Sequence, residues 1–301
     1  MAGIQLVHGR LDHIIIMTNS LPSTLTVFDT AVHLVEGNIS IPKTNYAQHQ
    51  CDAQTFYLAI PGIARFFALP EDNRIIIEKA SPEIPMHVLN TWLMGTVMAY
   101  MLQYHGYLVL HGSAVFINGS AVILSGQSGA GKSTLASALL KQGHPFITDD
   151  LVVIKQHTNG QYGIIPGPAQ SKLWQDAASH LDHDIEHAPP VNLKTDKYAI
   201  PVTNYCDMPM IPIAAFYELN IDSLATTFSC ERLTDMLSLR TLIHNAYRYF
   251  MLKPLGKLQS FLNDCSQLTQ QIAVNKITRR PDLSELSQII QRIELDQGVT
   301  S

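Results

Sequence analysis

The stretch Ala121–Leu140, AVILSGQSGAGKSTLASALL, decides the fold of this chain. It places an apolar run, a glycine-rich loop and an Ala/Leu-rich helical run in direct succession. The loop, Gly126–Ser133, fits the pattern G-x-x-x-x-G-K-[ST] at every fixed position. In a strand–loop–helix unit of this kind, the loop amides and the helix N-terminus converge on a phosphate chain. The stretch therefore predicts an α/β domain built around a phosphate-binding loop.

Each part of the loop has a physical task. Glycines allow backbone angles and a close approach that a Cβ would block, a lysine offers its charge to the β- and γ-phosphates, and a serine hydroxyl can ligate Mg²⁺. Lys132 and Ser133 are expected to take the last two tasks. We expect the nucleotide-binding set to comprise Gly126, Gln127, Ser128, Gly129, Ala130, Gly131, Lys132, Ser133 and Thr134.

A pair of carboxylates, Asp149 and Asp150, begins 17 residues after Lys132. One helix and one turn take up that interval, so the pair is expected at the C-terminal end of a strand lying beside the phosphate-loop strand. Adjacent residues of a strand point to opposite faces, so one carboxylate is expected to hold Mg²⁺ and the other to meet an acceptor hydroxyl. A surface turn is the alternative for this pair.

His111 ends an apolar run 15 residues before Gly126. A single histidine in an apolar region is more often a structural residue than a catalytic one. His111 therefore carries weight only together with the loop and the carboxylate pair.

Taken together, these three features make the segment Leu110–Asp150 resemble the C-terminal kinase domain of HPr kinase/phosphorylase. The segment is also similar to the HPr-kinase-related serine kinases of bacterial peptide-modification gene clusters, among them lasso-peptide precursor kinases. ATP-dependent phosphoenolpyruvate carboxykinase is a more distant relative. The resemblance implies a P-loop kinase domain of the HPr kinase/phosphoenolpyruvate carboxykinase type, preceded by a small β-rich lobe.

The resemblance also implies roles for individual residues. Asp149 is expected to be the base that takes the acceptor proton, with His111 beside it and Lys132 on the phosphates. Asp150 and Ser133 are expected at the metal. A further nucleotide-binding cation is expected at Lys197.

The function implied is an ATP-dependent serine kinase that uses Mg²⁺ and acts on a peptide or small protein, such as a ribosomal peptide precursor. The family also makes a homo-oligomer an expected state. Two alternatives stay open: a small-molecule hydroxyl kinase of the same fold, and a non-catalytic, nucleotide-dependent peptide-binding module.

The composition excludes several other classes of protein. The chain has 301 residues, of which 46% are hydrophobic and 15% charged, and its net charge is −5, which is typical of a folded globular protein without a nucleic-acid-binding surface. Its four cysteines form no CxxC pair, and its first residues lack the pattern of a signal peptide, so we expect a cytoplasmic location. The uncharged stretch between Glu83 and Lys132 is too interrupted to span a membrane, so no membrane partner is expected.

Residues 1–84 are rich in short strand-like runs, and residues 85–301 are expected to form the P-loop domain. Within the latter, Asn118-Gly119 predicts a tight hairpin before the phosphate loop, and residues 171–181 and a closing segment capped by Asp282 are expected to be helical. The histidines His180, His183 and His187 lie at helical spacing; we favour a solvated helix end over a metal site there.

Overall fold

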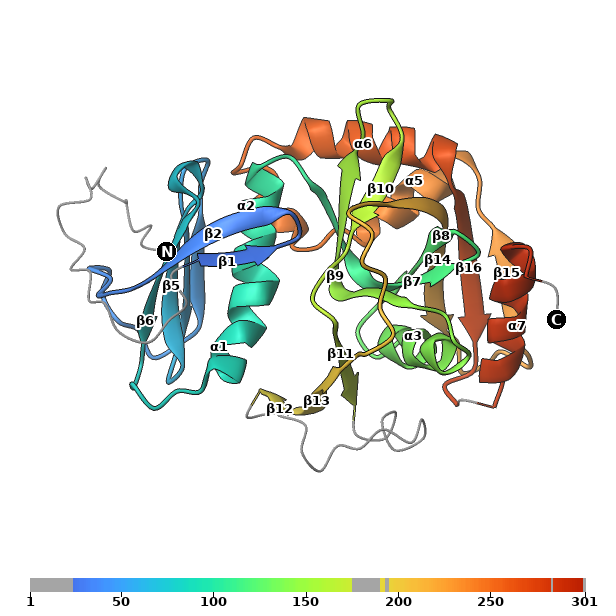
Figure 1. Ribbon diagram of the computed structural model, residues 1–301, viewed down its shortest axis with the longest axis horizontal. Helices are drawn as coiled ribbons and strands as arrows, with labels where there is room; N and C mark the ends of the chain where they lie inside the picture. The colour runs from blue at the N-terminus through green and yellow to red at the C-terminus, as the bar shows by residue number, and fades with distance from the viewer. Residues whose placement is uncertain (1–23, 175–189, 193–194, 283, 300–301) are drawn as a thin grey trace.

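The structure of the protein is a computed structural model that describes residues 24–174, 190–192, 195–282 and 284–299 (Figure 1). It has a mixed α/β architecture in which the described strands form sheets of six, seven and three strands. Within the described ranges, no helix has both the length and the apolar character needed to cross a membrane.

The six-stranded sheet contains the N-terminal strands in the order β1-β2-β6-β5-β4-β3. Burial alternates along β2 and β5, so one face of this sheet packs inward, as expected for strands with apolar residues at every second position. The short helical turn η2 (Pro70–Asp72) connects two of the strands. The strands are β1 (Thr24–Val27), β2 (Thr30–Glu36), β3 (Gln48–Cys51), β4 (Phe56–Ile60), β5 (Ala64–Leu69) and β6 (Arg74–Lys79).

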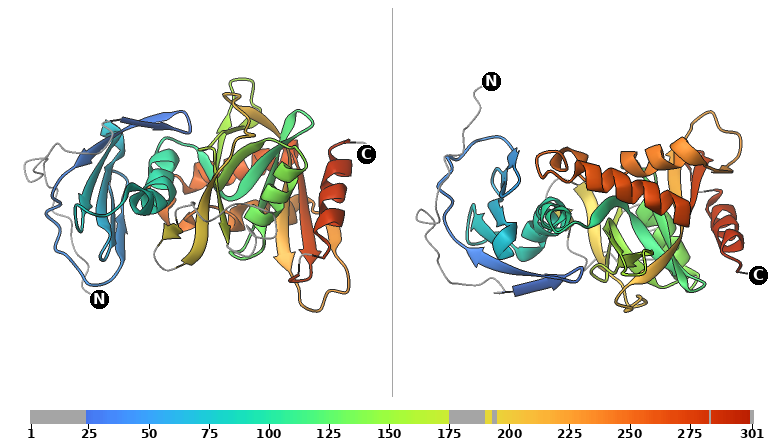
Figure 2. Two further views of the ribbon diagram at one scale, coloured as in Figure 1. Left: turned by 60° about the horizontal axis from the view of Figure 1, so that its bottom comes forward. Right: turned by 90° about the horizontal axis from the view of Figure 1, so that it is seen from above.

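One helical segment stands between the two larger sheets, as the two views of Figure 2 show. It consists of α1 (Met86–Trp92), a π-helical turn η3 (Leu93–Val97) and α2 (Met98–Tyr104). The buried side chains of this segment share one hydrophobic core with Phe66 of β5 and with Leu151 of the seven-stranded sheet. This core contains residues from both sides of the predicted boundary at residue 85. The division into domains 1–84 and 85–301 therefore stays a prediction.

The seven-stranded sheet has the order β10-β9-β7-β8-β14-β16-β15, and β10 also pairs with β14, which closes five of the strands into a ring. The strands β8, β14 and β16 run parallel to one another, whereas β7 is antiparallel to both β8 and β9. The strands are β7 (Leu108–Ile117), β8 (Ser120–Gly126), β9 (Phe146–Gln156), β10 (Tyr162–Ile165), β14 (Ile211–Ile221), β15 (Ser229–Arg232) and β16 (Ala273–Arg279).

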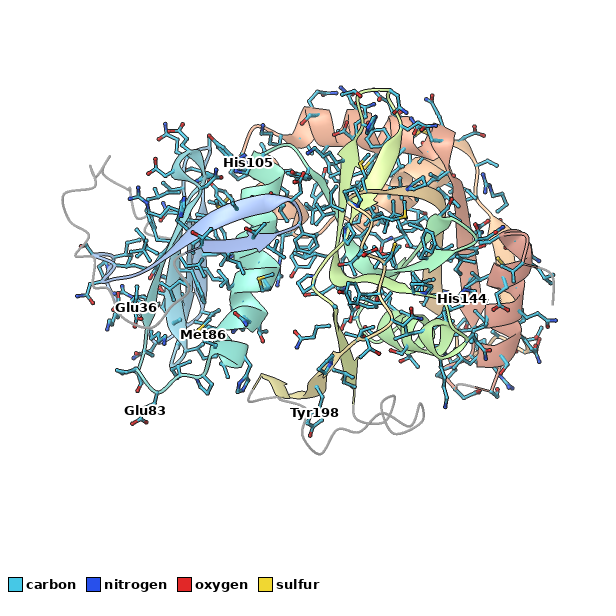
Figure 3. The ribbon with its side chains drawn as sticks, viewed as in Figure 1. Glu36, Glu83, Met86, His105, His144 and Tyr198 are labelled. Carbon is cyan, nitrogen blue, oxygen red and sulfur yellow. The ribbon has the colours of Figure 1, made fainter. Side chains whose placement is uncertain are left out.

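Helices cover both faces of this sheet. The apolar side chains of α3 (Lys132–Lys141) and α7 (Leu286–Asp296) pack on one face, and those of α5 (Asp235–His244) and α6 (Leu258–Gln271) pack on the other. The turn η4 (Tyr249–Met251) lies between α5 and α6 in the sequence. His144, which follows α3, contacts the Glu294 carboxylate of α7 at 2.8 Å and so ties the two helices together (Figure 3).

The local predictions around the phosphate loop are confirmed. Asn118 and Gly119, at φ 46° and 86°, form the two-residue turn between β7 and β8. The predicted helix follows the loop as α3 and ends just before Gly143, whose φ of 98° requires glycine.

The predicted position of the carboxylate strand is wrong in two respects. The strand β9 is not the neighbour of β8, because β7 folds back through the hairpin and pairs with both of them. The Asp149–Asp150 pair also lies within β9 rather than at its end, since the strand continues to Gln156.

The third sheet has the order β11-β13-β12, with β11 (Gln170–Trp174), β12 (Pro190–Asn192) and β13 (Thr195–Pro201). The helix predicted for residues 171–181 is therefore wrong over residues 171–174, where cross-strand pairing with β13 overrides local helical propensity. The predicted cap of the last helix is also wrong: Glu285 stands at the N-cap of α7, and Asp282 accepts a hydrogen bond from the amide of Ser284. His180, His183 and His187 lie outside the described residues.

Candidate active site

The phosphate loop is packed so closely that two of its positions admit only glycine. A Cβ on Gly126, which has φ 134°, would lie 2.4 Å from the carbonyl oxygen of Leu219 in β14. A Cβ on Gly131, which has φ 96° and caps α3, would lie 2.6 Å from the guanidinium of Arg279. These contacts fix the loop between a neighbouring strand and a buried cation.

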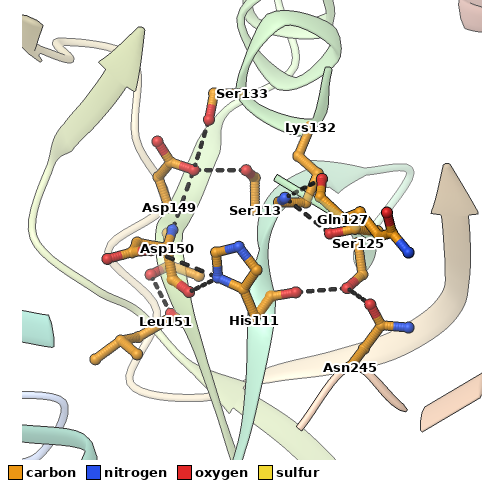
Figure 4. Close-up of polar contacts among 12 residues, drawn as sticks. His111, Ser113, Ser125, Gln127, Lys132, Ser133, Asp149, Asp150, Leu151 and Asn245 are labelled. Atoms are coloured by element: carbon orange, nitrogen blue, oxygen red, sulfur yellow. Dashed lines mark hydrogen bonds and ion pairs between the residues drawn. The ribbon is translucent and has the colours of Figure 1, made fainter. Parts of the chain in front are cut away.

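Lys132, the first residue of α3, directs its ammonium group into the loop. Its Nζ donates to the carbonyl oxygens of Gly126 and Gln127 at 2.9 and 3.0 Å (Figure 4). The residue is buried, at 8% exposure, so its charge is concentrated at the loop instead of being screened by water. A phosphate chain cradled by the loop would meet this charge.

Asp149 faces the phosphate loop from β9. Its Oδ1 accepts hydrogen bonds from the hydroxyls of Ser113 and Ser133, at 2.6 and 3.2 Å (Figure 4). Its Oδ2 accepts one from Ser171 of β11 at 3.3 Å. Ser113 is also the cross-strand partner of Asp149 in the β7–β9 register. A serine hydroxyl and a carboxylate side by side form a donor set that fits Mg²⁺, which prefers oxygen ligands.

Asp150 has an unusual backbone conformation. Its φ of 75° lies in the left-handed region, which a non-glycine residue adopts at some cost and most often at functional sites. This conformation breaks the regular alternation of the strand: the Asp149 carboxylate contacts Ser113 and the Asp150 carboxylate lies 3.5 Å from His111, and these two residues of β7 share one face. Both aspartates also line one cavity, which has a volume of about 570 Å³. The expectation that the two side chains point to opposite faces is therefore wrong.

His111 contacts Asp150. Its Nδ1 lies 3.1 Å from the Asp150 carbonyl oxygen and 3.5 Å from the Asp150 carboxylate, so Nδ1 is the protonated nitrogen that donates to the carbonyl. Burial, and next the charge of Lys132, lower the pKa of His111, which favours the neutral ring. The ring was expected beside Asp149; the residue of β7 that bonds to that carboxylate is Ser113.

Tyr247 and Gly95 complete the surroundings of Asp150, and neither was predicted from the sequence. A Cβ on Gly95, in the π-helical turn, would lie 3.1 Å from the Tyr247 hydroxyl and 3.9 Å from the Asp150 carboxylate. Burial, and next the Asp150 charge, raise the pKa of Tyr247, so the phenol stays protonated. In the sequence, Gly95 stands within a largely apolar helical run, and a glycine at such a position indicates that another group packs closely against the helix.

A buried hydrogen-bond network supports the strand that leads into the loop. The Ser125 hydroxyl donates to Asn245 Oδ1 at 2.8 Å, and the Asn245 amide donates to the Glu218 carboxylate of β14 at 3.0 Å. The backbone amide of His111 donates to the Asn245 carbonyl at 2.7 Å. The network thus connects β7, β8 and β14 directly beneath the site.

Arg279, at the end of β16, braces the phosphate loop from behind. Its guanidinium donates to the carbonyl oxygens of Ala130, Arg280 and Asp282, at 2.8, 2.7 and 3.0 Å. It is 7% exposed, and burial lowers its pKa, although arginine remains charged at any physiological pH. No spacing rule in the sequence links Arg279 to the loop, because about 150 residues separate them.

The structure brings together most of the predicted site residues, with the exception of Lys197. Lys132 and Ser133 belong to the loop, Asp149 contacts Ser133, and His111 adjoins Asp150. Lys197 lies in β13 opposite Trp174, and its side chain is outside the described part of the structure, so its role stays a prediction.

Comparisons with known proteins show similarity to one described family and to HPr kinases. The family described as SynChlorMet cassette protein ScmC matches residues 75–195, which include the phosphate loop and both carboxylates. HPr kinase/phosphorylase of Mycoplasmopsis pulmonis is 38% identical over 68 residues, which are 22% of this chain and 22% of that protein. The Hpr(Ser) kinase/phosphatase of Coxiella burnetii is a solved structure with a TM-score of 0.30 and 16% identity, covering 62% of this chain and 88% of that one.

The resemblance to HPr kinase/phosphorylase predicted from the sequence is confirmed by these comparisons. The chain spans about a fifth of the length of the curated relative that it matches.

Proposed function

We propose that this protein is a Mg²⁺/ATP-dependent kinase that transfers the γ-phosphoryl group to a serine-type hydroxyl of a peptide or small protein. One observation carries the proposal: Ser133 of the phosphate loop is in hydrogen-bond contact with Asp149, and Asp149 and Asp150 both line an adjoining cavity. The resemblance to HPr kinase/phosphorylase supports the same reaction class.

The residues present fit both cofactors. The loop amides and Lys132 would hold the phosphates of ATP, and Ser133 with Asp149 would hold Mg²⁺. When bound, ATP supplies the phosphoryl group and Mg²⁺ offsets its negative charge.

The contacts favour an exchange of the roles expected from the sequence for the two carboxylates, the proton acceptor and the metal ligand. Asp149 adjoins Ser133 and is therefore the better placed to share a metal ion with it. Asp150 instead adjoins His111 and lines the cavity, where an acceptor would enter. We therefore assign the proton-accepting role to Asp150 and the metal-holding role to Asp149.

His111 acts as a positioning residue in this scheme. Its ring donates to the Asp150 carbonyl and so holds the strained backbone that turns the carboxylate toward the cavity. A neutral ring does this without drawing the Asp150 carboxylate into a strong ion pair, which leaves that carboxylate able to accept a proton.

The test is phosphoryl transfer from γ-³²P-ATP in a desalted lysate of the source organism supplied with Mg²⁺. Purified wild-type protein is compared with Asp150→Asn and, as a matched control, with Glu83→Gln, an exposed acid in the loop before α1 (Figure 3). We expect labelled peptide or protein with the wild type and the control, and none with Asp150→Asn. Label confined to small molecules would contradict the peptide acceptor, and ATP binding without any mutation-sensitive label would contradict a kinase.

A further inference from the structure

The hairpin formed by β1 and β2 connects the six-stranded sheet to the strand that carries the two carboxylates. Its turn residues, Phe28 and Asp29, have φ 50° and 62°, as a tight two-residue hairpin requires. Phe28 is 4% exposed, and its ring packs against Gly167 so closely that a Cβ on Gly167 would lie 2.9 Å from the ring. Asp29 accepts a hydrogen bond from Lys155 of β9 at 3.0 Å. Figure 1 shows the hairpin reaching across α2 toward β9.

The cavity of about 570 Å³ lies beneath this hairpin. Its walls come from β1 and its turn, from α1 and the first part of η3, from Asp149–Leu151 and from the loop Pro166–Gln170. A volume in this range holds a small ligand or a few residues of a peptide. The cavity thus joins the two carboxylates to the edge of the N-terminal sheet.

The edge of β1 faces this cavity with its backbone. The consecutive residues Leu25, Thr26 and Val27 all line the cavity, and since adjacent side chains alternate between faces, the strand presents its edge to it. Among the strands that the structure describes, β1 is also the outermost of its sheet.

The register identifies which backbone groups point outward. Val27 and Thr30 flank the two-residue turn and form a hydrogen-bonded pair, so the next pair, Thr26 and Ala31, is a non-hydrogen-bonded one. In such a pair, the N–H and C=O of each residue point away from the partner strand. The N–H and C=O of Thr26 therefore point toward the cavity, and no strand within the described ranges pairs with them.

The charges around the cavity restrict what can bind there. Three acidic residues line it, Asp29, Asp149 and Asp150, whereas none of the described lining residues is Lys or Arg. A free amino acid, a carboxylated metabolite or a sugar phosphate would bring a negative charge that meets no Lys or Arg among these described lining residues. A peptide segment with neutral or basic side chains brings backbone amides and no such charge.

We propose that the acceptor binds as an extended peptide segment that adds a strand to the Thr26 edge of β1 and presents its hydroxyl to Asp150. This inference rests on the proposed kinase function and deepens it by naming the class of substrate. Main-chain hydrogen bonds to a sheet edge are an established mode of peptide binding. Asp150 takes the proton of the acceptor hydroxyl, whose oxygen forms a bond to the γ-phosphorus while the bond between that phosphorus and ADP breaks.

The test compares Thr26→Pro with Thr26→Val. Proline removes the outward N–H, which the β1–β2 pairing does not use, and it is tolerated on sheet edges; valine keeps the N–H and a similar shape. The acceptor is a degenerate decapeptide library with a fixed central Ser and neutral or basic flanking residues, assayed with γ-³²P-ATP and Mg²⁺. Nucleotide binding by calorimetry and thermal melting of each variant report on the loop and on folding.

We expect Thr26→Pro to fall at least about five-fold below Thr26→Val in kcat/KM for peptides, which is the effect of one lost hydrogen bond, with equal ATP affinity. Equal transfer by both variants would overturn the edge-binding inference and leave the kinase function standing. Transfer by the wild type to free serine or glycerol and to no peptide would overturn the peptide acceptor. ATP binding without transfer to any acceptor would overturn the kinase function itself.

A second measurement needs no variant, in case Thr26→Pro does not fold. Single peptides selected from the library are resynthesised with one backbone amide N-methylated at a time and assayed with the wild-type protein. Strand addition predicts that methylation blocks transfer at alternate positions, because only every second amide faces the β1 edge. Uniform tolerance of methylation would overturn the inference.

Discussion

The Ser133 hydroxyl lies 3.2 Å from Oδ1 of Asp149, and this contact joins the start of α3 to the middle of β9. Asp150 has a different neighbour, since its backbone carbonyl accepts a hydrogen bond from the ring of His111.

The two carboxylates are expected to respond differently to the same substitution. In Asp149→Asn, ATP binding should lose most of its dependence on Mg²⁺, because one of the two expected metal ligands loses its charge. In Asp150→Asn, Mg²⁺-dependent ATP binding should persist while transfer falls by about 10²-fold or more, the range for loss of a general base. Calorimetric titration of ATP with and without Mg²⁺, combined with a transfer assay, separates the two. The opposite pattern would restore Asp149 as the base.

Lys132→Ala is expected to reduce transfer by about 10²-fold or more, because a buried cation at the phosphate loop is lost from the site where negative charge is stabilised. Lys141→Ala, at the exposed C-terminal end of the same helix, is the matched control and should retain transfer. Steady-state rates at saturating ATP provide the comparison. Equal rates for the two variants would show that the Lys132 charge does not act on the phosphates.

Arg279→Ala is expected to weaken ATP binding about ten-fold, since the loop carbonyl of Ala130 loses its buried donor and the loop loses its support. Arg279→Lys should recover only part of the affinity, because an ammonium cannot reproduce the three divergent hydrogen bonds of the guanidinium. Arg292→Ala, which removes an exposed ion pair on α7, serves as the control. Unchanged affinity in Arg279→Ala would mean that the loop holds its shape without the brace.

Phe28→Ala is expected to lower the free energy of unfolding by about 3 kcal/mol, as for a buried aromatic ring, and to raise KM for a peptide acceptor without changing ATP affinity. Asp29→Asn removes the exposed ion pair with Lys155 at the same turn and should cost less than about 1 kcal/mol. Urea unfolding and acceptor titrations measure both effects. A parallel loss of ATP affinity in Phe28→Ala would show that the hairpin supports nucleotide binding instead of acceptor binding.

The pH dependence of stability should reveal the buried ring of His111. Its pKa is lowered in the folded protein, first by burial, so below the ordinary value near 6.5 the unfolded chain binds more protons than the folded one. Stability is therefore complete above about pH 6.5 and falls as the pH decreases toward the lowered pKa. Urea unfolding between pH 5.5 and 7.5 should show a smaller loss in His111→Gln than in the wild type, since His105, whose pKa is also lowered, titrates in both. Parallel curves would show that His111 is protonated equally in both states.

The sequence by itself determined the phosphate loop, its flanking strand and helix, and the hairpin at Asn118-Gly119. These are local features, in which glycine conformation, turn chemistry and hydrophobic period act over a few residues and require no distant partner. It also predicted that the Asp149–Asp150 pair would lie near the loop, and Asp149 does contact Ser133, although its strand is not the neighbour of β8.

Tertiary structure alone decided which carboxylate faces the loop and what surrounds each of them. The strand β7 lies between β8 and β9. The left-handed conformation of Asp150 breaks the side-chain alternation from which opposite faces were expected for the two carboxylates. Arg279, Tyr247 and the β1–β2 hairpin reach the site from segments distant in the chain, where no spacing rule connects them to the loop. Their positions depend on how three sheets and a shared core pack, because burial and strand pairing are properties of the whole fold and not of any short segment.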